Sequence, residues 1–262
     1  MNHDPVLRSD SGAVALLTLN RPAVLNSFDR PMALRLQEHL AACASDPAVR
    51  AVLVTGAGAG FCAGQDLNEF LASSGDAAVL GATVEASYNP VIRAIRGLER
   101  PVVCALNGVA AGAGANLALA CDFVLAAESA TLVQSFSRIG LVPDSGGSFF
   151  LPRLVGLARA TELIMLGDKI TAAEAARCGL IHRVVPDREL MARAQALALR
   201  LAAMPTVALG LAKRLLNQSL TNSLEEQLAL ERDLQTLAGK TADFREGVAA
   251  FLEKRRPSYR GC

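Results

Sequence analysis

Two glycine-rich segments of the sequence could present backbone N–H groups to an anionic oxygen. The first, residues 52–67 (VLVTGAGAGFCAGQDL), places glycines directly after an apolar run that is typical of a buried strand. The second, residues 107–122 (NGVAAGAGANLALACD), has Gly108, Gly112 and Gly114 where a strand is expected to turn into an alanine-rich helix. Glycine lets the backbone approach a ligand closely, and a helix start adds positive partial charge. A backbone N–H aimed there at a developing negative oxygen would contribute to an oxyanion hole.

Other interpretations of these two segments remain open on the residues alone. Residues 58–64 (GAGFCAG) are faintly similar to a dinucleotide fingerprint, and residues 55–56 to the start of a short-chain dehydrogenase. The context disfavours both, because the loop follows a second strand and no acidic residue ends a strand about 20 residues on. The two tyrosines, Tyr88 and Tyr259, also lack a lysine four residues later. A plain tight turn and close helix packing are the structural alternatives for the two segments.

Residues 140–147 (GLVPDSGG) form the third segment with possible chemistry, centred on Asp144. The sequence PDSGG is similar to the serine nucleophile loop of trypsin-like proteases, and His39 precedes it. Those enzymes are all-β, disulfide-bearing and secreted, and His39 lies within a predicted helix, so this interpretation fails. From its neighbours alone, Asp144 is expected to form an Asx turn or to cap the following helix.

Strands and helices alternate along the first two thirds of the chain, which predicts an α/β fold with buried parallel strands. The expected strands are 13–19, 51–55, 102–106, 123–126 and 181–185. The expected helices include 32–44, one carrying residues 88–98, one ending near 121, and a short one opened by a capping box at 171–174. From residue 190 onward the pattern is helical and rich in leucine, and Ser223 with Glu226 predicts a further capping box. We expect this tail to pack on the core or on a sister subunit.

Composition excludes several classes of protein. The chain has 262 residues, a net charge of +1 and 52% hydrophobic residues, so no global charge favours nucleic acid or an anionic membrane. No apolar run reaches the ~18 residues of a membrane helix, and the first ten residues lack the apolar run of a secretory signal. Six cysteines without a C-x-x-C pair and three scattered histidines predict neither a disulfide framework nor a metal site. We expect a cytoplasmic protein.

The three segments together resemble the crotonase, or enoyl-CoA hydratase/isomerase, superfamily from about residue 13 to residue 257. The resemblance rests on the order LNRP, LNSF, GFCAGQDL, NGVAAGAG and GLVPDSGG at these separations. Within the superfamily the chain is most similar to the phenylacetate-pathway isomerases that act on ring-1,2-epoxyphenylacetyl-CoA. That similarity rests on GFCAGQDLN, YNP at 88–90, NGVAAGAGA, FSRIGLVPDSGG, LERD and ADFREGVAAFLEKR.

The resemblance implies a spiral of repeated ββα turns, spanning 1–195 and binding acyl-CoA, followed by a helical oligomerisation region at 196–262. It implies a homotrimer or homohexamer. It also implies an acyl-CoA substrate and no separate cofactor, because coenzyme A is part of the substrate.

Matched position by position, the resemblance places the two oxyanion-hole N–H groups on Gln65 and Ala113. The adenine and pantetheine of the substrate would lie along Leu25, Ala63, Gln65, Asp66 and Leu67. Val109 and Gly112 would lie near the thioester. Candidate walls of the acyl pocket are Tyr88, Ala111, Phe136 and Leu141.

The sequence departs from the family pattern for hydration. A hydratase uses two glutamates to hold and deliver water, and those positions fall on Asn116 and Phe136 here. Phenylalanine cannot activate water, and asparagine cannot exchange a proton at neutral pH. Asp144 matches instead the aspartate that isomerase-type members place after Val-Pro. One carboxylate beside a stabilised enolate can move a proton between two carbons, which favours isomerisation.

We therefore expect a CoA-thioester isomerase that converts ring-1,2-epoxyphenylacetyl-CoA to its oxepin in phenylacetate degradation. The alternatives are an enoyl-CoA hydratase or double-bond isomerase of fatty-acid-type substrates, with Asn116 and bound water taking part in hydration, and a non-catalytic acyl-CoA-binding protein.

Overall fold

The computed structural model describes residues 4–72 and 77–262, whose strands form two sheets. The six-stranded sheet has the order β1-β2-β3-β5-β7-β10, and only the β1–β2 pair is antiparallel. Its strands are β1 (Val6–Ser11), β2 (Val14–Leu19), β3 (Ala51–Gly56), β5 (Val102–Leu106), β7 (Phe123–Ala127) and β10 (Arg183–Val185). The four-stranded sheet has the order β4-β6-β8-β9. Its strands are β4 (Gly60–Cys62), β6 (Val109–Ala111), β8 (Thr131–Val133) and β9 (Lys169–Thr171).

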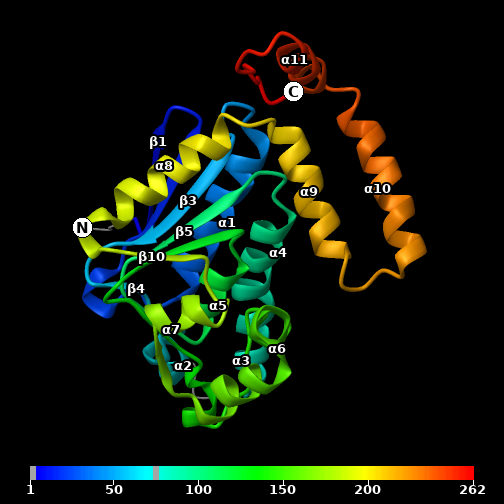
Figure 1. Ribbon diagram of the computed structural model, residues 1–262. Coiled ribbons are helices and arrows are strands. Elements are labelled where there is room, and N and C mark those ends of the chain that lie inside the picture. Colours follow the sequence, from blue (N-terminus) through cyan, green and yellow to red (C-terminus); the bar gives the residue numbers. More distant parts are fainter. Residues whose placement is uncertain (1–3, 73–76) are drawn as a thin grey trace.

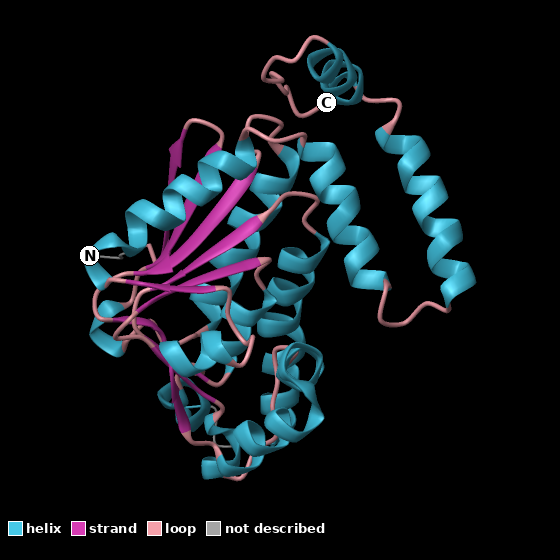
Figure 2. Cartoon of the chain, in the orientation of Figure 1, coloured by secondary structure: helices cyan, strands magenta, loops and turns pink. Residues whose placement is uncertain are grey.

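The two sheets arise from a repeated ββα turn. Each of β3, β5 and β7 leads into a short strand of the second sheet, β4, β6 and β8 respectively, and then into helices. Figures 1 and 2 show the two sheets with the helices around them. This arrangement confirms the spiral expected from the resemblance. The helices of these turns are α2 (Leu67–Ala72), α3 (Ala77–Thr83), α4 (Asn89–Gly97), α5 (Ala113–Ala120) and α6 (Gly147–Leu166).

Buried apolar strands form the centre of the core. Every residue of β3 and of β5 is buried, as their uninterrupted apolar runs predict for parallel strands covered on both faces. Helix α1 (Arg30–Ser45) begins at Asp29, whose carboxylate accepts a hydrogen bond from Met32 N at 2.9 Å. The α1 face that carries Leu36 and Leu40 is buried in the same core.

The remaining helices differ in how they attach to this body. Helix α7 (Ala172–Arg177) is short, and α8 (Leu190–Ala202) packs on β3 and β5. Helices α9 (Thr206–Gln218), α10 (Leu224–Ala238) and α11 (Ala242–Leu252) then leave the body as an arm, which Figure 1 shows in orange and red. The domain boundary predicted at residue 195 falls inside α8, whereas the arm begins only after Ala202. The division of the chain into two domains stays a proposal.

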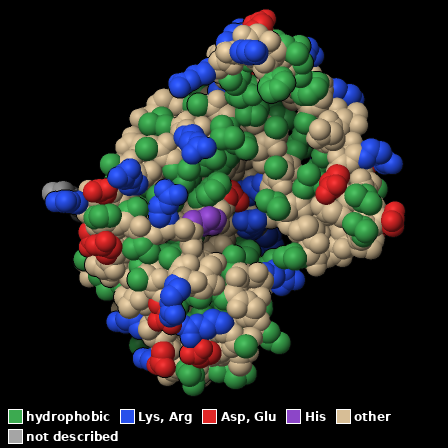
Figure 3. All heavy atoms as spheres, in the orientation of Figure 1, with side chains coloured by type: hydrophobic (Ala, Val, Ile, Leu, Met, Phe, Trp, Pro, Cys, Tyr) green, Lys and Arg blue, Asp and Glu red, His purple; other side chains and the backbone are tan. Residues whose placement is uncertain are grey.

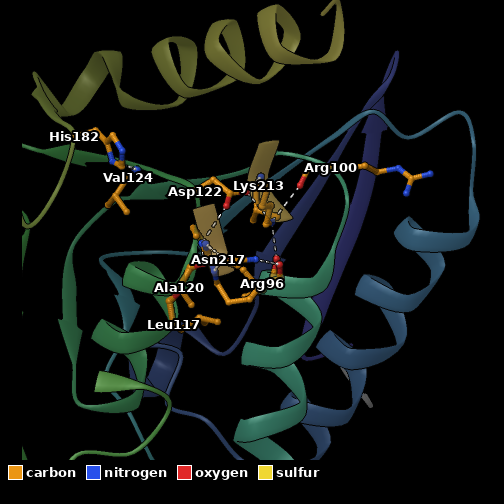
Figure 4. A network of polar contacts seen from close by, with 12 residues as sticks. Arg96, Arg100, Leu117, Ala120, Asp122, Val124, His182, Lys213 and Asn217 are labelled. Atoms are coloured by element: carbon orange, nitrogen blue, oxygen red, sulfur yellow. Dashed lines mark hydrogen bonds and ion pairs between the residues drawn. The ribbon is translucent and has the colours of Figure 1, made fainter. Parts of the chain in front are cut away.

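A buried polar network fixes the start of the arm to the body (Figure 4). Lys213 of α9 donates to Asp122 Oδ2 at 2.8 Å and to the backbone oxygen of Ile95 at 2.6 Å. Asp122 also accepts from Arg96 Nη1 at 3.1 Å and from Val102 N at 2.8 Å. Lys213 is only 7% exposed. Because a buried charge is costly unless it is paired, these contacts hold α9 in one orientation.

Within the described residues, no single helix is long and apolar enough to cross a membrane. One bent pair of helical segments, 187–202 and 206–218, meets the length and composition criteria only when the two are taken together.

Candidate active site

The two glycine-rich loops meet because they follow neighbouring parallel strands. β4 pairs with β6 in parallel, so their carboxyl ends lie at the same edge of the second sheet. The first loop then runs through Gly64 and Gln65, and the second through Gly112 into Ala113, the first residue of α5. A Cβ on Gly64 would lie 2.8 Å from the backbone oxygen of Ala111 and 3.7 Å from Ala113 N. The loops can therefore touch only because Gly64 has no side chain.

The hydrogen bonds around Gln65 orient its N–H group. Phe28 N donates to the Gly64 oxygen at 2.6 Å, and Asp66 N donates to the Phe28 oxygen at 2.8 Å. In a trans peptide the N–H points opposite to the preceding C=O, so the N–H of Gln65 points away from Phe28. Ala113 opens α5, where N–H groups have no partner inside the helix. Neither N–H donates to any group in the part of the chain that the structure describes.

Asp144 lies in the loop before α6 with a carboxylate that is only partly engaged. Its Oδ1 accepts a hydrogen bond from Ser145 Oγ at 2.9 Å. Burial raises the pKa of Asp144 above its ordinary value, and the Ser145 hydrogen bond opposes that rise. Helix α6 has Gly146 at its N-cap and no side-chain cap, so the capping role weighed for Asp144 is wrong. Ser145 adopts φ = 50°, a conformation unusual for residues other than glycine and frequent at functional sites.

The two positions that the resemblance assigns to the hydratase glutamates hold groups that cannot activate water. Asn116 is fully buried and its amide is occupied at both ends. Its Nδ2 donates to the Asp144 backbone oxygen at 2.9 Å, and its Oδ1 accepts from Gln134 Nε2 at 2.9 Å. Phe136 is buried, and a Cβ on Gly112 would lie 3.5 Å from its ring. Asn116 thus fixes the backbone of the loop that carries Asp144.

A small apolar cavity lies between these elements. It brings together the start of α5, the residue that hydrogen-bonds Asp144, and Tyr88. Its lining residues are Phe28, Tyr88, Val91, Ile92, Ala113, Leu117 and Ser145. The cavity therefore joins one predicted oxyanion-hole residue to the loop of the predicted acid/base.

The predicted coenzyme A contacts lie around the first loop. Ala63 N donates to the backbone oxygen of Leu25 at 3.0 Å, and the side chains of Leu25 and Leu67 are 40% and 48% exposed. Asp66 is buried and bonded to Arg21 Nη2 at 2.9 Å. Burial acts to raise the pKa of Asp66, but the Arg21 and backbone hydrogen bonds outweigh it, so the pKa lies below its ordinary value. The Asp66 carboxylate thus holds Arg21 in place, and its contact with the substrate stays a prediction.

Three further predicted positions are half-buried. Val109 and Ala111 belong to β6, and Leu141 N donates to the Phe136 oxygen at 2.9 Å.

Sequence reasoning missed residues that hold the loops rather than contact a ligand. Asn26 is fully buried, and its Nδ2 donates to the backbone oxygens of Ala57 and Gly60 at 2.9 and 2.8 Å. Its Oδ1 accepts from Arg21 N at 2.8 Å. Gln134, which supports Asn116, was also missed. These roles depend on contacts distant in sequence, and the only available signal was a polar residue inside the LNRP–LNSF segment.

A larger cavity lies elsewhere, between the body and the arm. It borders the opposite end of α5 from Ala113, and Figure 3 shows hydrophobic side chains gathered on this part of the surface. Its polar lining includes Lys213 and Arg96, both of which already pair with Asp122. This cavity is not part of the candidate active site.

The fold and the site define a class: a spiral α/β protein in which two glycine-rich loops touch and the second opens a helix beside a small cavity, which Ser145, the hydrogen-bond partner of Asp144, also lines. The chain belongs to the enoyl-CoA hydratase/isomerase family, whose profile matches residues 9–261. This membership confirms the crotonase resemblance and makes the protein a member of a family of enzymes acting on CoA thioesters.

Similar proteins agree with this assignment. The chain is 52% identical over 249 residues, 95% of each chain, to the 1,2-epoxyphenylacetyl-CoA isomerase of Escherichia coli K12. It is 44% identical over 265 residues, the full length of both, to a probable enoyl-CoA hydratase of Rhodobacter capsulatus. Among solved structures, a putative enoyl-CoA hydratase/isomerase of Mycobacterium abscessus superimposes with a TM-score of 0.92 at 40% identity, covering 97% of this chain and 98% of the other.

Proposed function

We propose that the protein is a CoA-thioester isomerase that acts on ring-1,2-epoxyphenylacetyl-CoA in phenylacetate degradation. The N–H groups of Gln65 and Ala113 bind the thioester oxygen as it becomes an enolate, each contributing about 3 kcal/mol to lowering the barrier. Asp144 takes a proton from the carbon next to the thioester and returns it to a ring carbon. The charge delocalised from the thioester assists rearrangement of the epoxide to the oxepin.

The proposal rests mainly on the surroundings of the Asp144 carboxylate. This carboxylate has no ion pair in the described part of the chain, and its hydrogen-bond partner Ser145 lines the same cavity as Ala113. A raised pKa suits a group that must both accept and release a proton near neutral pH. The locked amide of Asn116 and the ring of Phe136 favour isomerisation over hydration. The identity to the E. coli isomerase supports the choice of acyl group.

The test is Asp144→Asn with freshly made ring-1,2-epoxyphenylacetyl-CoA. Asparagine keeps the shape of the side chain but cannot exchange a proton, so kcat is expected to fall about 10²- to 10⁴-fold. Binding of coenzyme A and the melting temperature should be preserved. Asp10→Asn, an exposed aspartate on β1 that pairs with Arg8, is the matched control and should keep full activity.

Product mass separates isomerisation from the alternatives. An isomerisation leaves the mass of the CoA ester unchanged, whereas hydration adds one water. Full activity of Asp144→Asn, or a hydrated product, would overturn the proposal; tight binding without turnover of any CoA ester would indicate a non-catalytic protein.

The assembly is part of the proposal. The arm exposes large apolar side chains, including Leu216 at 69%, Leu224 at 71% and Phe251 at 82%. Exposed apolar surface of this kind marks an interaction site, and we propose that further copies of the chain cover it in a homotrimer or homohexamer. We also propose a cytoplasmic location, which the free thiols of the buried cysteines fit.

A further inference from the structure

Tyr88 carries a buried hydroxyl group that the proposed reaction leaves unused. The side chain is 2% exposed, and its hydroxyl has no hydrogen-bond partner among the residues that the structure describes. A buried tyrosine hydroxyl nearly always finds a partner, because leaving it unpaired costs about 1–3 kcal/mol. An unpaired hydroxyl beside a candidate active site therefore suggests that its partner arrives with the substrate.

Tyr88 lies at an unusual turn of the backbone. Tyr88 ends a π-helix, Val84–Tyr88, that runs directly into α4. Single π-turns inside helices are rare and occur frequently at functional sites. Gln37 Nε2 of α1 donates to the backbone oxygens of Ala86 and Ser87 at 3.2 and 3.0 Å and so holds the π-turn in place.

The ring of Tyr88 is packed against Phe28, a residue just before α1 whose backbone is hydrogen-bonded to the first loop. It meets the ring of Phe28 edge-on, with centroids 5.7 Å apart and an interplanar angle of 81°. The backbone of Phe28 bonds on both sides of Gln65, as described above. One packed unit therefore positions both the Tyr88 ring and the Gln65 N–H.

Tyr88 lines the same cavity as residues of the candidate active site. Ala113 and Ser145 also line this cavity. Burial and, after it, the negative charge of Asp144 raise the pKa of Tyr88 well above its ordinary value. The phenol is thus fully protonated at neutral pH and can act only as a hydrogen-bonding group, not as a base.

We propose that Tyr88 is a further catalytic residue, whose hydroxyl donates a hydrogen bond to the ring oxygen of the epoxide substrate. The inference rests on the proposed function and extends it to the acyl group. The proposed function assigns the thioester oxygen to the two loops and the migrating proton to Asp144, so the ring oxygen is the one polar atom of the acyl group without an assigned partner. Tyr88 keeps its proton throughout. The bond that breaks on the way to the oxepin is the C–C bond between the two epoxide carbons, and both C–O bonds stay intact, so the hydrogen bond acts by holding the ring oxygen in place while the ring expands.

The experiment compares Tyr88→Phe with the unmodified enzyme in two measurements. The first is kcat and KM on ring-1,2-epoxyphenylacetyl-CoA. The second is the Kd of phenylacetyl-CoA, which has the same ring and thioester but no ring oxygen. Removing one hydrogen bond that orients the reacting ring is expected to lower kcat about 10- to 100-fold. The Kd of phenylacetyl-CoA should not change, because the ring of residue 88 still packs on Phe28.

The second tyrosine of the chain gives a matched control. Tyr259→Phe removes the same atom near the C-terminus and should alter neither measurement. Unchanged kcat in Tyr88→Phe would overturn the proposal, and so would an equal loss of kcat and of phenylacetyl-CoA affinity, which would show that the hydroxyl only supports packing. If the unmodified enzyme binds phenylacetyl-CoA but leaves the epoxide unchanged, the proposed function fails and the role of Tyr88 fails with it.

Discussion

At the scale of single residues, the protonation of Asp144 sets the expected pH dependence. Burial raises its pKa above the ~3.9 of a free aspartate, and the base must be ionised to remove a proton. We therefore expect kcat/KM to rise with pH on an acid limb whose midpoint lies above that value. Ser145→Gly removes the hydrogen bond that lowers the pKa and tolerates φ = 50°, so it should move the limb to higher pH. If the midpoint of the acid limb is the same in Ser145→Gly as in the unmodified enzyme, Asp144 is not the group whose ionisation produces the limb.

The residues themselves were unequally predictable. Gln65, Ala113 and Asp144 could be selected because each belongs to a loop whose glycines and order along the chain form a specific pattern. Asn26 could not, because its role consists of hydrogen bonds to backbone atoms more than 30 positions away. The unpaired hydroxyl of Tyr88 was equally hidden, since the sequence gives a residue's type but not the partners it lacks.

At the scale of elements, the contact between the two loops should control catalysis. Gly64→Ala would place a Cβ 2.8 Å from the Ala111 oxygen at φ = 89°, so the loops must separate and the two N–H groups lose their alignment. We expect kcat on the epoxide substrate to fall about 10²- to 10³-fold, as when an oxyanion-hole donor is lost. Gly12→Ala is the control, because φ is 59° there and nothing lies within 4 Å of the added Cβ. Both variants introduce backbone strain of about 1–2 kcal/mol at a positive φ, and Gly64→Ala alone adds the clash with Ala111, so equal kcat in the two would refute the role of the contact.

The elements that sequence predicted are those whose signal is local. The mainly apolar run of β3, the apolar run of β5 and the capping box of Ser223 with Glu226 each lie within a few residues, and the structure confirms them. At Thr171 only half of the expected box forms, because the Glu174 carboxylate pairs with Arg159. The three-residue strands β4, β6, β8 and β9 were not predicted, since so short a strand exists only through its neighbours in the sheet.

At the scale of the whole molecule, a buried ionic network and an exposed apolar surface meet at the arm. The contacts of Lys213 orient α9 relative to the sheet. Helix α10 runs back alongside α9, and most of the large apolar residues of α10 and α11 are exposed (Figures 1 and 3). The leucine-rich pattern of the tail predicted helices correctly. It could not tell packing on the chain's own core from packing on another copy, because both bury the same helical face.

The proposed assembly predicts the mass of the protein in solution. Light scattering after size-exclusion chromatography should give three or six times the 27.4 kDa of one chain. Phe251→Glu with Leu252→Glu places two charges where the side chains are 82% and 74% exposed, and buried charges at an interface are strongly unfavourable. The double variant should therefore shift toward the monomer mass without a large loss of melting temperature in the monomer itself. Leu7→Glu, a 45% exposed leucine on β1, makes the same change away from the arm and should keep the full assembly. A wild-type protein of 27.4 kDa in solution, or a double variant as large as the wild type, would contradict assembly through this surface.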